Sequence, residues 1–128
     1  HEADDLSAAL DYLEERFPNA ELWAGGFSFG ARTTAAHVLR DDRVKRVVLV
    51  AVPVTGFDCA VIEDVTTPGY VVQAGRDQFG NLADLKRLYP NISDALELDE
   101  IPDVEHFFQG KTRELEERVR NYASGVLT

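Results

Sequence analysis

Gly-Phe-Ser-Phe-Gly at residues 26–30 is the stretch that decides the fold of this chain. It follows a short apolar run and leads into an alanine-rich stretch of helical character that begins at Ala31. Gly-x-Ser-x-Gly between a strand and a helix is typical of a nucleophile elbow, a turn so tight that its serine adopts strained backbone angles. Gly26 and Gly30 would leave room where a Cβ would clash with the neighbouring strand or helix. The pattern therefore predicts that Ser28 lies at the C-terminal end of a strand and at a helix N-terminus.

Hydrophobic periodicity on both sides of this turn alternates between helices and strands. The predicted helices cover residues 3–17, 31–40, 81–89 and 111–125, with a short helical turn at 59–64, and the predicted strands cover 21–25, 44–52, 69–74 and 95–100. The second half of 44–52 is continuously apolar, as expected for a parallel strand covered on both faces, whereas 95–100 alternates apolar and acidic residues and is predicted near a sheet edge. This order predicts one α/β domain over residues 1–128, with a mostly parallel sheet and helices on both faces.

Bulk composition restricts the classes of protein to which this chain can belong. It has 128 residues, of which 45% are hydrophobic and 28% charged, as is usual for a soluble globular protein. A formal net charge of −10 argues against nucleic acid or an anionic membrane surface as a partner, because both attract basic patches. No apolar run approaches the roughly 20 residues of a membrane span, no signal-peptide pattern opens the chain, and the single cysteine, Cys59, excludes an internal disulfide. We therefore expect a cytoplasmic protein.

A serine hydroxyl needs a base before it can act as a nucleophile, and the chain offers three histidines. His37 lies nine residues after Ser28 on the same predicted helix, roughly 13 Å along its axis, which is too far to reach. His1 stands at the first position, where we expect fraying. That leaves His106, in the loop at 102–107 between the last strand and the last helix. In a parallel sheet this loop opens at the same edge as the serine turn, where open α/β sheets place their ligands.

Two carboxylates qualify as the acid that orients this histidine. Asp77 directly follows a predicted strand, whereas Asp58 lies six residues past the end of another. We favour Asp77 because it is close to its strand end and is framed by a tight turn, and Asp58 stays open as the alternative. A buried carboxylate on the far imidazole nitrogen would fix the tautomer and stabilise the imidazolium. The order Ser28, Asp77, His106 is the order expected in an α/β-hydrolase.

Three stretches of the chain resemble small bacterial α/β-hydrolases that lack a lid domain, of the dienelactone-hydrolase-like kind. Residues 22–31 (Leu-Trp-Ala-Gly-Gly-Phe-Ser-Phe-Gly-Ala) resemble the elbow of that family, and residues 104–110 (Val-Glu-His-Phe-Phe-Gln-Gly) resemble its histidine loop. Residues 71–77 (Val-Val-Gln-Ala-Gly-Arg-Asp) resemble its acid loop, which is usually closer to His-Gly-x-x-Asp. The departure at residues 73–74 leaves Asp77 in register, and the resemblance covers nearly the whole chain.

The resemblance implies a serine hydrolase that acts on an ester or similar acyl bond of a small molecule. Ser28 would attack the acyl carbon, His106 would act as base and then as acid, and Asp77 would orient His106. The backbone N–H of Phe29 would supply one of the two oxyanion donors.

Members of that family carry several strands before the helix that feeds the elbow strand, and an early loop that supplies the second oxyanion donor. Neither is present in this sequence, so we expect an α/β-hydrolase fold that lacks its N-terminal strands and is weak or inactive alone. The strand before Ser28 would then have a bare edge, which favours self-association.

The competing interpretation is a non-catalytic α/β-hydrolase-like domain with a binding or scaffolding role. Other chemistries find less support. Cys59 is predicted to be a small buried residue. Residues 25–30 have the spacing of a phosphate loop, but Ala31 and Arg32 stand where Lys and Ser or Thr are required. The dinucleotide fingerprint also fails, and no metal-ligand cluster of recognisable spacing occurs. We therefore predict no cofactor and no metal.

Overall fold

The predicted alternation of helices and strands is confirmed by the computed structural model, which describes the backbone of residues 2–127 and the side chains of residues 8–126. In chain order the elements are α1 (Glu2–Arg16), β1 (Leu22–Phe27), α2 (Phe29–Val38), β2 (Val44–Val50), η1 (Ala60–Asp64), β3 (Gly69–Ala74), α3 (Leu82–Leu88), β4 (Leu96–Ile101) and α4 (Thr112–Leu127). Every bound lies within two residues of the predicted one. Within the described backbone, no helix is long and apolar enough to cross a membrane.

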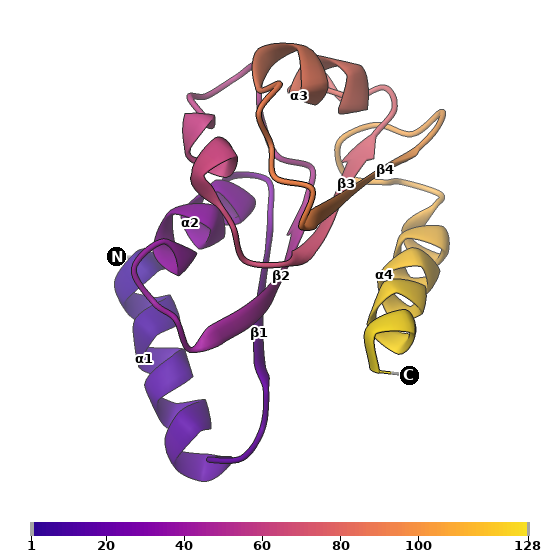
Figure 1. The fold of residues 1–128 in the computed structure, drawn as a ribbon. Coiled ribbons are helices and arrows are strands. Elements are labelled where there is room, and N and C mark those ends of the chain that lie inside the picture. The colour runs from indigo at the N-terminus through magenta and orange to yellow at the C-terminus, as the bar shows by residue number, and fades with distance from the viewer. Residues whose placement is uncertain (1, 128) are drawn as a thin grey trace.

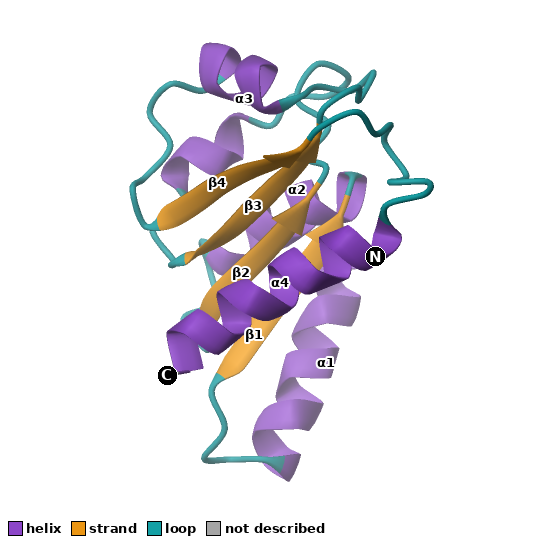
Figure 2. Ribbon diagram, turned by 90° about the vertical axis from the view of Figure 1, so that its right-hand side faces the viewer, coloured by secondary structure: helices purple, strands orange, loops and turns teal. Residues whose placement is uncertain are grey.

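The four strands form one parallel sheet in the order β1-β2-β3-β4, which confirms the predicted fold class (Figure 1). β4 forms one edge, as predicted for residues 95–100. Because each crossover joins neighbouring parallel strands with the same hand, the connecting helices lie on one face of the sheet and α4 crosses the other (Figure 2). All strand C-termini therefore meet at one edge, which is where the predicted site residues follow β1, β3 and β4.

The two faces of the sheet are covered to different extents. On one face, α1, α2, η1 and α3 bury a large apolar cluster that includes Leu49 and Val71. On the other face, a smaller cluster around Tyr70, Val72 and Phe108 packs against α4. As a result β3 is buried along its whole length, whereas the last residue of β1, Phe27, is 40% exposed. The sheet is therefore closed in its interior and open at β1, beside the serine turn.

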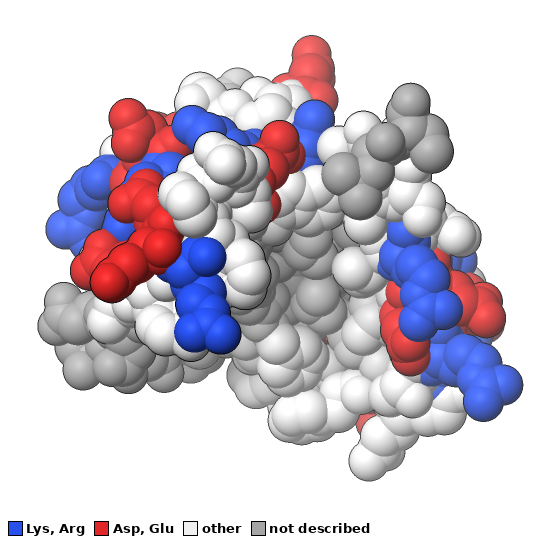
Figure 3. All heavy atoms as spheres, turned by 90° about the horizontal axis from the view of Figure 1, so that it is seen from below, with Lys and Arg blue, Asp and Glu red and all other residues white. Residues whose placement is uncertain are grey.

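Charged side chains are mixed in sign on the face shown in Figure 3. Lys, Arg, Asp and Glu gather on two sides of that face, and both signs of charge occur in each group. Among the residues described there, no extended basic surface of the kind that binds nucleic acid is visible.

Candidate active site

Ser28 occupies the predicted turn between β1 and α2, with φ 59° and ψ −123°. Its N–H donates to the Val50 carbonyl oxygen at 2.8 Å, which continues the pairing of β1 with β2. Its own carbonyl oxygen accepts the N–H of Ala31 at 3.0 Å, which begins α2. A positive φ is unfavourable for a residue with a Cβ, so this conformation persists because the strand and the helix hold it from both sides.

The two glycines of the turn have different roles. A Cβ on Gly26 would lie 2.3 Å from the Gly30 carbonyl oxygen, so any side chain there would force β1 and α2 apart. A Cβ on Gly30 would have no described atom within 4 Å. The expectation that Gly30 must leave room is therefore wrong. The close approach is made by the Gly30 backbone, and a side chain on that residue would point into open space.

A chain of hydrogen bonds joins the three predicted side chains. Ser28 Oγ lies 2.8 Å from His106 Nε2, and His106 Nδ1 lies 2.6 Å from Asp77 Oδ2. A carboxylate only accepts, so with Asp77 ionised the imidazole proton belongs on Nδ1 and Nε2 accepts from the Ser28 hydroxyl. Serine at a helix N-terminus usually caps the helix, but Ser28 makes no side-chain capping bond, which leaves its hydroxyl for His106.

The turn after β3 encloses the Asp77 side chain completely. The exposed fraction of that side chain is 0%, against 7% for the side chain of His106. Its second oxygen, Oδ1, accepts the N–H of Phe79 at 2.8 Å. The backbone of Asp77 closes the same turn, because its N–H donates to Ala74 and its carbonyl oxygen accepts from Gly80. Both carboxylate oxygens thus have partners that fix the plane of the group against His106.

Aromatic rings surround the imidazole of His106. The ring centroids of Phe27, Phe79 and Phe107 lie 5.1, 5.0 and 5.1 Å from its centroid. Sequence reasoning missed this environment. A signal was available, because Phe27 directly precedes Ser28, Phe79 lies two positions after Asp77 and Phe107 directly follows His106. Rings packed on three sides restrict the rotation of the imidazole and lower the local polarity.

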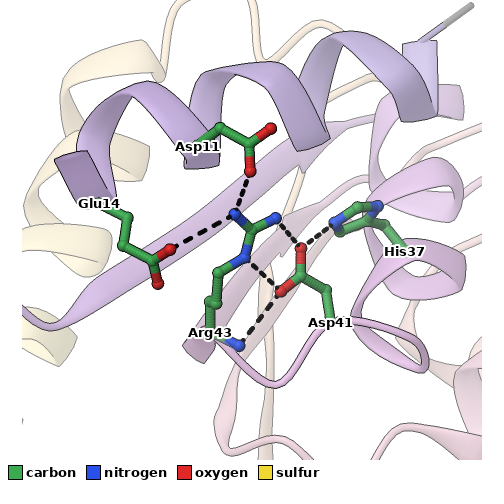
Figure 4. A network of polar contacts seen from close by, with 5 residues as sticks. All are labelled: Asp11, Glu14, His37, Asp41 and Arg43. Carbon is green, nitrogen blue, oxygen red and sulfur yellow. Dashed lines mark hydrogen bonds and ion pairs between the residues drawn. The ribbon is translucent and has the colours of Figure 1, made fainter.

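The histidines and the acid that the sequence analysis set aside or left open lie elsewhere. His37 Nε2 is 2.7 Å from Asp41 Oδ2, in a polar network at the C-terminal end of α2 (Figure 4). Asp58 is exposed and its Oδ1 accepts the N–H of Ala60, the first residue of η1, at 2.9 Å. His1 lies outside the described residues. Of the two candidate acids, Asp77 contacts His106, whereas the side chain of Asp58 accepts a hydrogen bond from the backbone two residues further on.

Two further site predictions can be compared with the geometry. Burial raises the pKa of the Cys59 thiol to about 11, and the residue is 1% exposed, as predicted.

Phe29 is the first residue of α2, where a backbone N–H has no partner within the helix. Its position next to Ser28 allows that N–H to face an oxygen bound at the serine. Among the described residues, no group of three or more His, Cys, Asp or Glu side chains is arranged to hold a metal ion.

Comparisons with known proteins agree with this fold. Residues 2–126 match a family model described as an alpha/beta hydrolase domain. An uncharacterised protein of Rickettsia prowazekii (strain Madrid E) is 28% identical over 130 residues, which cover 94% of this chain and 55% of that protein.

Two solved structures are similar along nearly the whole chain. An alpha-beta serine hydrolase homologue from Coxiella burnetii matches with a TM-score of 0.79 and 31% identity, covering 93% of this chain and 57% of its own. A serine hydrolase without a lid from Xanthomonas campestris matches with a TM-score of 0.80 and 25% identity, covering 93% and 54%. This chain thus spans little more than half the length of the relatives that it matches.

Proposed function

Because this chain belongs to the alpha/beta hydrolase family, we propose that it carries the nucleophile, base and acid of a serine hydrolase that acts on an ester or similar acyl bond. The observation that carries the proposal is the continuous hydrogen-bonded series Ser28–His106–Asp77, with separations of 2.8 and 2.6 Å. The partner is a small-molecule acyl substrate. The proposed reaction uses these side chains, a backbone N–H and water.

Acylation begins when Ser28 Oγ attacks the acyl carbon and its proton passes to His106 Nε2. The imidazolium that forms is stabilised by Asp77, whose carboxylate already accepts from Nδ1. Negative charge develops on the former carbonyl oxygen, and the N–H of Phe29 at the N-terminus of α2 donates to it. Collapse of the tetrahedral intermediate breaks the bond to the leaving alcohol, which takes the proton from Nε2. Ser28 is left as an ester.

Deacylation repeats these steps with water in place of the serine. His106 Nε2 removes a proton from a water molecule as its oxygen attacks the acyl carbon. The second tetrahedral intermediate then collapses, and Ser28 Oγ leaves with the proton from Nε2. The products are a carboxylic acid and the free enzyme, so each turnover consumes one ester and one water.

The direct test is covalent labelling of the full-length protein with a fluorophosphonate, which reacts with activated serines. We expect one adduct, on the peptide that contains Ser28, and none in the Ser28→Ala variant. Ser124→Ala is the matched control, because that serine is exposed on α4 and lies outside the proposed site. It should label as the wild-type protein does.

A p-nitrophenyl acetate assay separates this proposal from a non-catalytic binding or scaffolding domain. The hydrolase proposal requires turnover by the wild-type protein and its loss in Ser28→Ala. Equal rates for the two proteins, or a folded wild-type protein that stays unlabelled by the fluorophosphonate, would exclude the proposed role of Ser28 and favour the scaffold.

Activity is proposed for the full-length protein. This chain supplies one proposed oxyanion donor, the N–H of Phe29, and a missing donor of this kind lowers rates by roughly 100- to 1000-fold. We therefore expect the isolated chain to be a weak or inactive hydrolase. The cytoplasmic location, the absence of nucleic-acid and membrane partners, and self-association through the edge of β1 stay predictions.

A further inference from the structure

We propose that the substrates are esters with an apolar acyl chain, which lies against the ring pair Phe29–Phe57, while the ring pair Phe27–Phe107 faces the leaving alcohol. This proposal rests on the proposed function, because it places the substrate around Ser28 and His106.

Four phenylalanine rings beside the Ser28 turn remain partly in solvent. Their exposed fractions are 40% for Phe27, 44% for Phe29, 49% for Phe57 and 68% for Phe107. Single exposed apolar side chains are common, whereas contiguous exposed apolar surface is often part of an interaction site or a ligand groove. Ring contacts group these four into two pairs, with centroid separations of 5.8 Å for Phe27–Phe107 and 5.6 Å for Phe29–Phe57. Phe27 and Phe29 immediately precede and follow Ser28, so both pairs border the nucleophile.

The contacts of each ring pair indicate which part of the ester lies beside it. Phe27 and Phe107 each lie 5.1 Å from the ring of His106, the residue that gives its proton to the leaving alcohol. The alcohol must therefore lie on the side of Phe27 and Phe107. With the alcohol on that side and the proposed oxyanion donor at Phe29, the acyl chain is left to extend toward the Phe29 ring and its neighbour Phe57.

The loop that carries Phe57 is held in place although the ring is half exposed. The N–H of Thr55 donates to the Phe79 carbonyl oxygen at 3.0 Å, and Arg32 Nε donates to the Asp58 carbonyl oxygen. Phe57 is therefore anchored from the acid turn on one side and from α2 on the other. A binding surface that is fixed before the ligand arrives costs less ordering entropy on binding.

The test compares kcat/KM for p-nitrophenyl acetate and p-nitrophenyl hexanoate, which share a leaving group and differ in acyl length. We expect the wild-type protein to prefer the hexanoate. Phe57→Ala should lower the hexanoate-to-acetate ratio of kcat/KM by about 10-fold, because only the longer chain reaches that ring. Phe57→Leu should keep part of the preference. Phe107→Ala should lower both esters by the same factor, and Phe17→Ala, which is exposed after α1, should change neither.

The outcomes separate this proposal from the one on which it rests. An unchanged hexanoate-to-acetate ratio in Phe57→Ala overturns the acyl assignment while the serine hydrolase stands. A ratio that changes in Phe107→Ala and not in Phe57→Ala overturns it too, because the acyl chain then lies on the opposite side. A wild-type protein that hydrolyses neither ester, with Ser28 unlabelled by fluorophosphonate, overturns the proposed function and this inference together.

Discussion

Two histidine–aspartate pairs in this protein have nearly the same geometry and different surroundings. The nitrogen–oxygen distance is 2.7 Å for His37 and Asp41, and 2.6 Å for His106 and Asp77. Both histidines are buried, with 7% and 6% of their surface exposed. A short, buried histidine–aspartate contact therefore does not by itself identify a catalytic base.

The surroundings of the two aspartates separate the pairs. Asp41 binds Arg43, and Arg43 reaches on to Asp11 and Glu14 of α1 (Figure 4). The network ties α1, the end of α2 and the start of β2 together. Asp77 instead accepts a backbone N–H from Phe79.

The second imidazole nitrogen of His106 has a partner of its own, which is a further difference between the two pairs. His106 holds its second nitrogen 2.8 Å from the hydroxyl of Ser28. In the His37 pair, the guanidinium of Arg43 binds the Asp41 carboxylate and neutralises its charge. The proposed base, His106, therefore differs from His37 in two respects. The described contacts of its carboxylate include no Arg or Lys, and a hydroxyl lies on the opposite side of its ring.

The largest expected effect is the loss of His106, and the loss of His37 is its matched control. His106→Ala should lower kcat by roughly 10⁴- to 10⁶-fold, because it removes the base from a set of residues that act as a unit. His37→Ala should leave kcat within about three-fold and reduce the free energy of unfolding by about 1–3 kcal/mol, because Asp41 loses a buried partner. Steady-state ester hydrolysis and urea unfolding of the two variants measure both quantities. A folded His37→Ala protein without turnover would contradict the comparison.

The next largest effect is expected from replacing the two candidate acids, Asp77 and Asp58, by asparagine. Asp77→Asn should lower kcat by about 10⁴-fold, because an amide at that position favours the wrong imidazole tautomer. Asp58→Asn should leave kcat unchanged within about two-fold, since that side chain bonds to the N–H of Ala60. The measurement is kcat for hydrolysis of p-nitrophenyl acetate by each variant at saturating substrate. Collapse of turnover in Asp58→Asn, with activity kept in Asp77→Asn, would move the acid role to Asp58.

A smaller effect should appear in stability when Arg43 is replaced by Met. Hydrogen bonds from Arg43 hold the pKa of Asp41 well below its usual range. A carboxylate with a lowered folded pKa contributes stability above its unfolded pKa of about 3.9, and this contribution is lost as the pH falls toward the folded value. Arg43→Met should lower the midpoint of urea unfolding at pH 7 by roughly 0.5 M and flatten its decline below pH 5.

The control for that experiment is Arg76→Met. Arg76 pairs with Asp103 while their side chains are 65% and 73% exposed, so its replacement should leave the midpoint nearly unchanged. Equal shifts of the unfolding midpoint in the two variants would show that burial of the Arg43–Asp41 pair does not increase its contribution to stability.

The smallest expected effect concerns Cys59, which carries the single thiol of the sequence. Because burial raises the pKa of the Cys59 thiol to about 11, about one molecule in a thousand carries a thiolate at pH 8. We expect slow alkylation by iodoacetamide in the folded protein, faster alkylation as the pH rises or urea is added, and turnover within about two-fold in Cys59→Ala. Rapid stoichiometric alkylation at pH 7 that abolishes turnover would make Cys59, and not only Ser28, part of the reactive site.

Much of the fold and of the candidate site could be predicted from local patterns. The continuous apolar run of β2 predicted a covered parallel strand, and the alternating pattern at residues 95–100 predicted the edge strand β4. The serine motif predicted the turn between β1 and α2. Each of these depends on neighbours within a few residues, where side-chain periodicity and backbone strain act directly.

The predictions that were wrong or incomplete depended on atoms far apart in the chain. Gly30 was expected to leave room for its neighbour, but only the direction of its Cα–Cβ bond in the fold shows that open space lies there. The ring of Phe79 was missed because its contact with His106 joins the turns after two different strands. The choice between Asp77 and Asp58 stayed open because both follow strands that end at the same edge.

By itself, the sequence determined the order of the elements, the strained serine turn and the residue types available at one edge of a parallel sheet. Only the tertiary structure decided which histidine meets Ser28, which aspartate meets that histidine and which phenylalanine rings border them. The physical reason is distance along the chain. Ser28 and His106 are 78 residues apart, and His106 and Asp77 are 29 apart. Their separations of under 3 Å therefore depend on the register and packing of the sheet, which no local pattern specifies.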